Sequence, residues 1–169
     1  ELTKPFPGAV AGAADGDVTL VEFTDYNCGY CRKSVEDVAR LVSDDPKLRV
    51  VYRELPILSP TSRDAARWAL AAARQGKHKA FHDAMFAAGP ADDASIRAAA
   101  QSAGLDMARA ETDADTPEIA AEIDANLAMM QQVGFTGTPT FVIGGQIIEG
   151  AQGYGALKAA VKKAREAKS

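Results

Sequence analysis

Two cysteines, Cys28 and Cys31, are the residues of this chain best suited to redox chemistry, and only two residues separate them. The apolar run of residues 18–24 predicts a β-strand before the pair, and an apolar stripe at helical spacing predicts a helix from about residue 28 to 42. Cys28 would then lie where free N–H groups and the helix dipole stabilise a thiolate and lower the thiol pKa. Cys28 could attack a disulfide, and Cys31, on the same helical face, could release the mixed disulfide.

Other roles for a cysteine pair fit this sequence less well. A structural disulfide across two residues would close a very small loop and stabilise the fold little. A closed zinc site needs about four ligands, and the chain has no second Cys-x-x-Cys. His78 and His82, on another predicted helix, are expected to be surface or capping residues, because nothing in the sequence brings them to the cysteines. The spacing therefore favours a redox-active pair, with metal binding as the next alternative.

The composition is that of a single globular domain with room for an insertion: 169 residues, 47% hydrophobic and 25% charged. The net charge of −4 and the lack of a Lys/Arg run argue against a nucleic-acid partner. No apolar segment approaches the length of a membrane span. Because the chain begins at Glu1 and shows no signal peptide, we expect its start to have been processed or trimmed. The cysteine spacing alone suits a cytosolic reductant or an exported oxidant equally.

The predicted elements follow the order strand, helix, strand, then a helical block, then two strands and a helix. Residues 1–16, rich in Pro and Gly, are expected to form an extended arm, and a second strand at 48–55 would complete a βαβ unit with parallel strands. A hairpin at 141–143 and 146–148, turning at Gly-Gly, and a terminal amphipathic helix would complete the chain. Apolar stripes bounded by Gly or Pro divide the block into helices at 60–75, 77–87, 93–103, 105–112 and 117–132.

The environments of several side chains follow from this pattern. Glu22 interrupts an apolar run, so it is either a solvent-facing residue of an alternating strand or a partly buried acid with a raised pKa that exchanges a proton with Cys31. Arg53 and Glu54, at the end of the second strand, are expected to face water. Four large apolar side chains are expected to form the core of the helical block: Trp68, Phe81, Met85 and Phe86.

Three stretches of sequence, placed in this order of elements, carry a resemblance to a known family. They are Glu-Phe-x-x-Tyr-x-Cys-x-x-Cys at 22–31, the run from Lys77 to Phe86, and Gly137-Thr138-Pro139-Thr140-Phe141. Over about residues 17–166 the chain resembles the DsbA-like family of exported thiol–disulfide oxidoreductases, which have the thioredoxin fold with a helical insertion.

The resemblance implies an α/β fold with three regions. An N-terminal arm would occupy 1–16, a thioredoxin-like domain 17–58 and 134–169, and a helical insertion 59–133.

The resemblance also implies roles for the cysteine stretch. Cys28 corresponds to the exposed nucleophile and Cys31 to the resolving cysteine, while Gly29 and Tyr30 form the dipeptide that tunes thiolate stability. Glu22 corresponds to a buried acid near the pair. The redox-active Cys28–Cys31 disulfide would be the only redox group needed, with no further cofactor and no metal.

Thr138 and Pro139 correspond to a loop whose cis-proline lies beside the disulfide. A cis X–Pro bond in a tight turn can leave the backbone of Thr138 free to pair with an incoming extended peptide. Proline itself has no N–H and no charge, so it can pack against the sulfurs without acting as a ligand.

The dipeptide between the cysteines departs from the strongly oxidising members of this family, which have Pro-His there. Tyr30 offers a hydroxyl in place of a possible cation, so we expect a less acidic Cys28 and a less oxidising disulfide. Gly29-Tyr30, and Thr138 before the proline, resemble the disulfide-isomerase branch instead.

The function expected from the sequence is that of a periplasmic thiol–disulfide oxidoreductase. It would form, reduce or isomerise disulfides in unfolded or misfolded proteins, with a membrane redox partner; the direction of the reaction and the oligomeric state stay open. Two alternatives from other classes are a protein that binds Cu(I) on the two thiolates and a peptide-binding chaperone whose cysteines are incidental.

Overall fold

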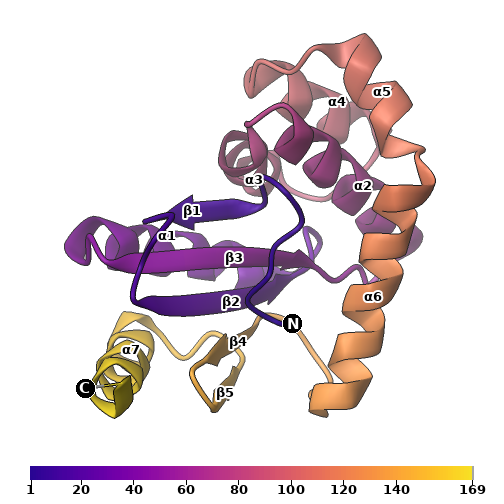
Figure 1. Ribbon diagram of the computed structural model, residues 1–169. Coiled ribbons are helices and arrows are strands. Elements are labelled where there is room, and N and C mark those ends of the chain that lie inside the picture. The colour runs from indigo at the N-terminus through magenta and orange to yellow at the C-terminus, as the bar shows by residue number, and fades with distance from the viewer. Residues whose placement is uncertain (169) are drawn as a thin grey trace.

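A computed structural model describes residues 1–168 of the chain, and in this range the strands form one mixed sheet (Figure 1). The order across the sheet is β1-β3-β2-β4-β5. β2 and β3 pair in parallel and the other neighbours are antiparallel. The strands are β1 (Val10–Gly12), β2 (Val18–Thr24), β3 (Leu48–Glu54), β4 (Thr140–Ile143) and β5 (Gln146–Glu149).

Helices cover both faces of this sheet. α1 and α7 pack on one face and α6 on the other, while α2 to α5 gather beyond the sheet and α6 runs back toward β4 (Figure 1). No helix within residues 1–168 has the length and apolar character needed to cross a membrane. The helices are α1 (Gly29–Asp44), α2 (Pro60–Arg74), α3 (His78–Ala87), α4 (Asp93–Ser102), α5 (Met107–Ala114), α6 (Pro117–Val133) and α7 (Tyr154–Lys168).

Coverage of both faces leaves β2 and β3 buried along almost their whole length. Leu20 and Val50 point to the face under α1 and α7, whereas Val21, Phe23 and Val51 point to the face under α6. A strand that is buried on both sides can carry apolar residues at consecutive positions, as at Leu20-Val21 and Val50-Val51, rather than at every second one. The α/β fold with an inserted helical subdomain is therefore as predicted.

Small residues allow the helices of the insertion to pack closely. α2 contributes a run of buried alanines, and the larger apolar side chains fill the spaces between helices. The predicted core of this block is confirmed, since four large side chains are buried there: Trp68, Phe81, Met85 and Phe86.

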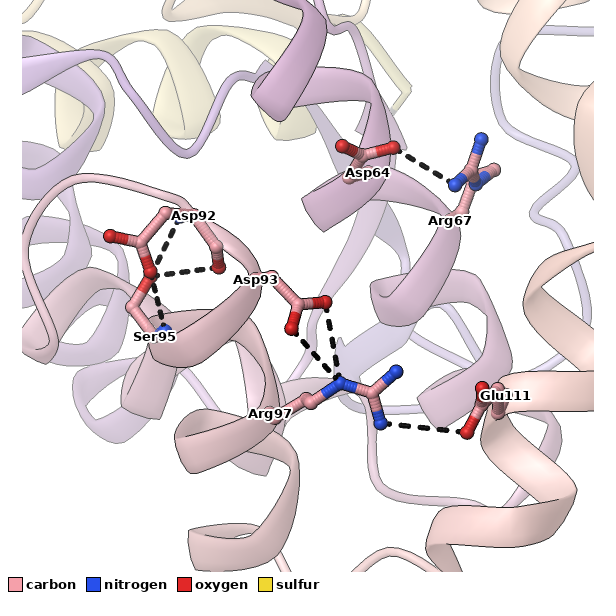
Figure 2. A network of polar contacts seen from close by, with 7 residues as sticks. All are labelled: Asp64, Arg67, Asp92, Asp93, Ser95, Arg97 and Glu111. Carbon is pink, nitrogen blue, oxygen red and sulfur yellow. Dashed lines mark hydrogen bonds and ion pairs between the residues drawn. The ribbon is translucent and has the colours of Figure 1, made fainter.

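Polar contacts on the outside of the insertion hold α4 in place (Figure 2). Asp92 and Ser95 form a reciprocal cap at the start of α4, with the Ser95 amide donating to Asp92 Oδ1 at 2.7 Å and the Asp92 amide donating to Ser95 Oγ at 2.9 Å. Arg97 then pairs with Asp93 one turn before it and with Glu111 of α5. These contacts fix the start of α4 and link it to α5, but the ion pairs add little stability because they are exposed.

Two expectations about exposure are wrong. Arg53 and Glu54 do not face water but are 3% and 0% exposed, because β3 is an inner strand with both faces covered. His78 and His82 are not surface or capping residues either: both are buried, on the side of α3 that faces the sheet and α2. The N-terminal arm also contains a short strand that was not predicted, β1, whose three residues pair with β3.

Arg53 lies on the α6 face of the sheet, where it joins three parts of the chain. Its Nη1 atom is 3.0 Å from Glu122 Oε2 of α6, and its Nη2 atom donates to backbone carbonyls near the N-terminus. The acceptors are the carbonyl oxygens of Glu1, Leu2 and Lys4. A buried guanidinium with this many acceptors ties the first residues and α6 to the central strand.

We expect Arg53→Met to lower the free energy of unfolding by about 3 kcal/mol, because it leaves Glu122 and the terminal carbonyls without their donor. The matched control is Arg63→Met, which removes a pair with Asp124 at 3.0 Å whose side chains are 35% and 67% exposed. That change is expected to cost no more than about 1 kcal/mol. Urea unfolding followed by circular dichroism measures both, and equal losses would contradict the anchoring role of Arg53.

Candidate active site at the start of helix α1

The turn between β2 and α1 is held by a buried acid, Asp25. Its Oδ1 atom accepts a hydrogen bond from the Asn27 amide at 2.9 Å, and its Oδ2 atom accepts from the amides of Ile57 and Leu58, each at 2.9 Å. The Asp25 carbonyl also accepts from the Cys28 amide at 3.0 Å. One side chain therefore fixes both the turn before the cysteines and the loop after β3.

Asn27 connects the same turn to the helical insertion. Its Nδ2 atom lies within hydrogen-bond distance of three hydroxyl oxygens at the start of α2, and its Oδ1 atom accepts from the Ala91 amide at 2.8 Å. The three hydroxyls belong to Ser59, Thr61 and Ser62. Sequence reasoning missed Asp25 and Asn27, although Asp and Asn just before a helix are typical turn and capping residues.

Cys28 is the N-cap residue of α1, and its sulfur accepts a hydrogen bond from the Cys31 amide at 3.2 Å. The pKa of Cys28 is lowered to about 6, first by its hydrogen bond with the Cys31 side chain, and also by Thr138 and the amides of Cys31 and Tyr30, against the opposing effect of burial. This is the charge stabilisation expected at a helix N-terminus. Cys28 is therefore largely a thiolate at neutral pH.

Cys31 has the opposite environment one turn later. It is 0% exposed, and burial raises its pKa far above that of an ordinary thiol, with further contributions from the hydrogen bond to Cys28 and the charges of Cys28 and Glu22. Cys28 is only 6% exposed, so the expectation of an exposed nucleophile is wrong, although it is less deeply buried than Cys31. The pair thus consists of one thiolate and one thiol that stays protonated. Any reaction of Cys31 requires a group that takes its proton.

The loop before β4 lies against the cysteines. The Thr138–Pro139 peptide bond is cis, as predicted, and the Cys28 thiol lies 3.4 Å from the Thr138 carbonyl oxygen. The Thr140 hydroxyl donates to the Gly137 carbonyl at 2.7 Å and closes the turn. The structure therefore brings the two predicted parts of the site together from positions more than a hundred residues apart in sequence.

The dipeptide between the cysteines is open to solvent. Tyr30 is 66% exposed, and a Cβ atom placed on Gly29 would meet no neighbouring atom within 4 Å. Space around the site therefore does not require a glycine at this position. Tyr30 acts on Cys28 through its backbone amide, as part of the helix N-terminus.

Glu22 lies under the pair, in the middle of the sheet. Its neighbours across the strands are Tyr52 and Phe141, and it is 1% exposed, so the expectation of a solvent-facing residue is wrong and that of a buried acid is confirmed. Burial, followed by the charges of Glu54 and Cys28, raises its pKa to about 8. Electrostatic contact with Cys28 and Cys31 places this acid within the influence of both thiols.

Beside Glu22 lies a cluster of buried polar side chains that sequence reasoning did not find. It contains Tyr26, Tyr52, Glu54, His78 and His82, joined by hydrogen bonds and ring contacts. The signal that could have found the histidines is their spacing, because a residue at i and one at i+4 share a helical face with the apolar Phe81 and Met85. Within residues 1–168, no group of three or more His, Cys, Asp or Glu side chains is arranged to hold a metal ion.

Comparison with known proteins assigns the fold and the site to a family. The model of the DSBA-like thioredoxin domain matches residues 19–162, which include the cysteine pair, Glu22 and the cis-proline loop. The chain belongs to the DSBA-like thioredoxin domain family.

Solved structures with the same fold agree with this assignment. A thioredoxin-like oxidoreductase from Silicibacter pomeroyi is 44% identical, with a TM-score of 0.90 over 93% of this chain and 91% of the other. A periplasmic thioredoxin-like protein from Salmonella enterica is 31% identical, with a TM-score of 0.86 over 98% and 94%. The thiol–disulfide exchange protein alpha-DsbA2 from Wolbachia pipientis is 28% identical, with a TM-score of 0.86 over 91% and 85%.

Curated relatives are much longer than this chain. A Na(+)/H(+) antiporter NhaA 1 from Salinispora arenicola is 32% identical over 158 residues, which are 92% of this chain and 24% of the antiporter. The chain thus spans about a quarter of the length of the curated relatives it matches.

The reduced DSBA-like domain is expected to show a thiolate absorbance at 240 nm that rises with a midpoint near pH 6, because Cys28 ionises there. Cys28→Ser should remove this transition, whereas Cys31→Ser should keep one and move it to higher pH, since the hydrogen bond from the Cys31 side chain is lost. A midpoint above pH 8 in the unaltered protein would contradict the stabilised thiolate.

Glu22→Gln is expected to stabilise the reduced protein at pH 7 by about 3 kcal/mol and to change nothing at pH 4. The folded pKa of about 8 lies above the usual 4.5, so folding holds a proton that the unfolded chain releases, and stability is lost as pH rises from 4.5 to 8. Glutamine does not ionise, so the variant does not lose this stability as the pH rises. Urea unfolding at both pH values tests this, with the exposed Glu36→Gln as control, and a gain that did not depend on pH would contradict the raised pKa.

Proposed function

We propose that the chain is a thiol–disulfide oxidoreductase that acts on disulfides of other proteins through Cys28 and Cys31. The observation that carries this proposal is the asymmetry of the pair: the Cys31 amide holds the Cys28 sulfur at 3.2 Å, Cys28 has a pKa of about 6, and Cys31 is buried and protonated. A nucleophile and a protected resolving thiol are what disulfide exchange requires. Family membership and the oxidoreductases of the same fold support it.

The reducing direction takes two exchanges. The Cys28 thiolate attacks one sulfur of a substrate disulfide, so that a bond from Cys28 to the substrate forms and the other substrate sulfur leaves as a thiolate. Cys31 then passes its proton to the ionised form of Glu22, a minor fraction at neutral pH, and attacks the Cys28 sulfur, which releases the second substrate thiolate. The substrate gains two electrons, and the Cys28–Cys31 pair becomes a disulfide.

The oxidising direction reverses these steps. A substrate thiolate attacks the Cys28 sulfur of the disulfide, and Cys31 leaves as a thiolate that takes a proton from Glu22. A carboxyl with a pKa of about 8 suits both tasks, because it is mostly protonated at neutral pH yet can ionise there. An isomerase uses the reducing and the oxidising reactions in turn.

We expect the Cys28–Cys31 disulfide to be less oxidising than the disulfides of the strongest oxidants of this type. The Cys28 pKa of about 6 lies between values of about 3.5 for DsbA and about 7 for thioredoxin, and a more stable thiolate makes the disulfide more oxidising. The Gly29-Tyr30 dipeptide supports the same conclusion, since it offers the thiolate no side-chain cation.

The substrates that fit this site are extended, cysteine-containing segments of unfolded or misfolded proteins. The cis-proline loop offers the backbone of Thr138 beside the Cys28 sulfur. Two large apolar side chains are exposed, Tyr30 in the first turn of α1 and Leu58 in the loop after β3. An extended peptide could pair with that backbone while its apolar groups cover those side chains. We further propose a periplasmic location, supported by the similarity to a periplasmic protein, with a membrane protein as the redox partner.

The first test combines an exchange assay with the reduction potential. The reduced protein should reduce the disulfide of a labelled peptide; Cys28→Ser should abolish the reaction, and Cys31→Ser should accumulate a mixed disulfide that mass spectrometry detects. Equilibration with glutathione buffers should give a potential between about −270 and −120 mV. Stoichiometric Cu(I) binding without exchange would instead support a metal-binding protein.

A further inference from the structure

A second acid lies beside Glu22 inside the protein. The register of β2 and β3 places Glu22 opposite Tyr52, and Thr24 opposite Glu54. Glu22 and Glu54 therefore project from the same face of two neighbouring strands, at diagonal positions offset by two residues in register. Both are buried, and the charge of Glu54 acts on Glu22. Two acids in one apolar site cannot both ionise without a large cost, so their protonation is coupled.

The partners of the two acids differ. Glu54 Oε2 lies 2.7 Å from His78 Nε2 and accepts a hydrogen bond from the Tyr26 hydroxyl at 3.4 Å. The pKa of Glu54 is raised, first by burial, and the hydrogen bond and charge of His78 and the hydrogen bond of Tyr26 oppose this rise in part. These donors favour the negative charge on Glu54, so that Glu22 is the acid that keeps a proton.

The helical insertion supplies this arrangement. His78 comes from α3, and so does His82, whose Nδ1 atom lies 3.3 Å from the Tyr26 hydroxyl. The Tyr52 ring packs against both imidazoles, with centroids 5.1 and 4.5 Å apart. Burial lowers the pKa of His82 well below its usual value, so His82 is neutral.

Other charged or titratable groups act on the two acids from each packed element. Lys79 of α3 opposes the raised pKa of Glu22, and Cys28 at the start of α1 adds to it. Glu122 of α6 adds to the raised pKa of Glu54, and Asp83 of α3 acts on Tyr52. Glu54 and His78 each have one further buried polar atom, Oε1 and Nδ1, that has no hydrogen-bond partner within residues 1–168. The hydrogen bond between Glu54 Oε2 and His78 Nε2 is therefore the main contact that decides which of the buried side chains carries a negative charge.

We propose that Glu54, held by His78 and Tyr26, is a positioning residue that keeps the proton of the buried acid pair on Glu22 and thereby sets the pH range in which Glu22 exchanges a proton with Cys31. This proposal rests on the proposed function, because proton exchange between Glu22 and Cys31 has a role only if the cysteine pair carries out disulfide exchange. Glu54 and His78 act through Glu22 and do not touch the sulfurs in the proposed steps. The helical insertion thus contributes to the chemistry of the cysteines by way of α3.

The direct test is a titration of Glu22 by NMR in protein labelled with ¹³C at the glutamate carboxyl groups. The Glu22 signal is assigned by its loss in Glu22→Gln. In Glu54→Gln the neighbouring charge is gone, and the midpoint of Glu22 is expected to fall by about one pH unit or more. His78→Gln should move it in the same direction, since Glu54 then takes up a proton. The double variant should add little to the effect of Glu54→Gln.

A kinetic measurement gives the second readout. The release of substrate from the mixed disulfide, followed by quenched flow, is expected to reach half of its maximal rate at a pH about one unit lower in Glu54→Gln. The control is Ile123→Val, a buried change in α6 that loses stability without changing any charge. It should leave both the Glu22 midpoint and the pH profile where they are.

The outcomes separate the two proposals. If Glu54→Gln and His78→Gln lower the melting temperature but leave the Glu22 midpoint unchanged, the cluster is only structural and this inference is overturned. If Glu54→Gln does not fold, Tyr26→Phe removes one donor to Glu54 and should still lower the midpoint. If the unaltered protein shows no disulfide exchange, the proposed function fails, while the titration still decides whether Glu54 controls Glu22.

Discussion

The hydrogen bond from the Cys31 amide to the Cys28 sulfur is the contact on which the site depends, because it exists only if Cys28 caps α1. The neighbouring residues fix that position: Asp25 holds the turn, and Asn27 ties it to the insertion. The same turn of helix that presents one sulfur to donors carries the other into the core. Opposite changes in the two thiol pKa values, downward for Cys28 and upward for Cys31, therefore follow from a single local geometry.

Burying Cys31 creates a need for a proton acceptor away from solvent. In the proposed mechanism Glu22 is this acceptor, because β2 is a central strand, covered on both faces, and the position of Glu22 opposite Tyr52 and Phe141 places a carboxyl under α1. An apolar residue there would make the sheet more stable. The raised pKa of Glu22 measures that cost, and it makes the acid useful near neutral pH.

Local patterns in the sequence were sufficient for the order of the elements from residue 18 onward and for the position of the cysteine pair, but not for β1. Strand and helix periods, glycines at helix ends and the two-residue spacing of Cys28 and Cys31 are all properties of short segments. The cis state of the Thr138–Pro139 bond came from resemblance rather than from the residues themselves. Polar residues whose burial depends on distant segments were missed, such as Glu54 and His78. Their polarity predicts exposure, and only the position of β3 inside the sheet and the packing of α3 against it reverse that expectation.

The helical insertion does more than shield the candidate active site from solvent, because its residues contact side chains that position the site. The hydroxyls at the start of α2 hold Asn27, and α3 holds Tyr26 and Glu54 through its two histidines. Asn27 and Tyr26 lie one and two residues before Cys28, and Glu54 lies on the strand that pairs with the strand of Glu22. In the mechanism proposed above, the dipeptide between the cysteines does not alone set the acidity of Cys31, because the charge of Glu54 acts on Glu22 and the charge of Glu22 acts on Cys31. Two proteins with the same Cys-Gly-Tyr-Cys sequence but different insertions would differ in redox behaviour for this electrostatic reason.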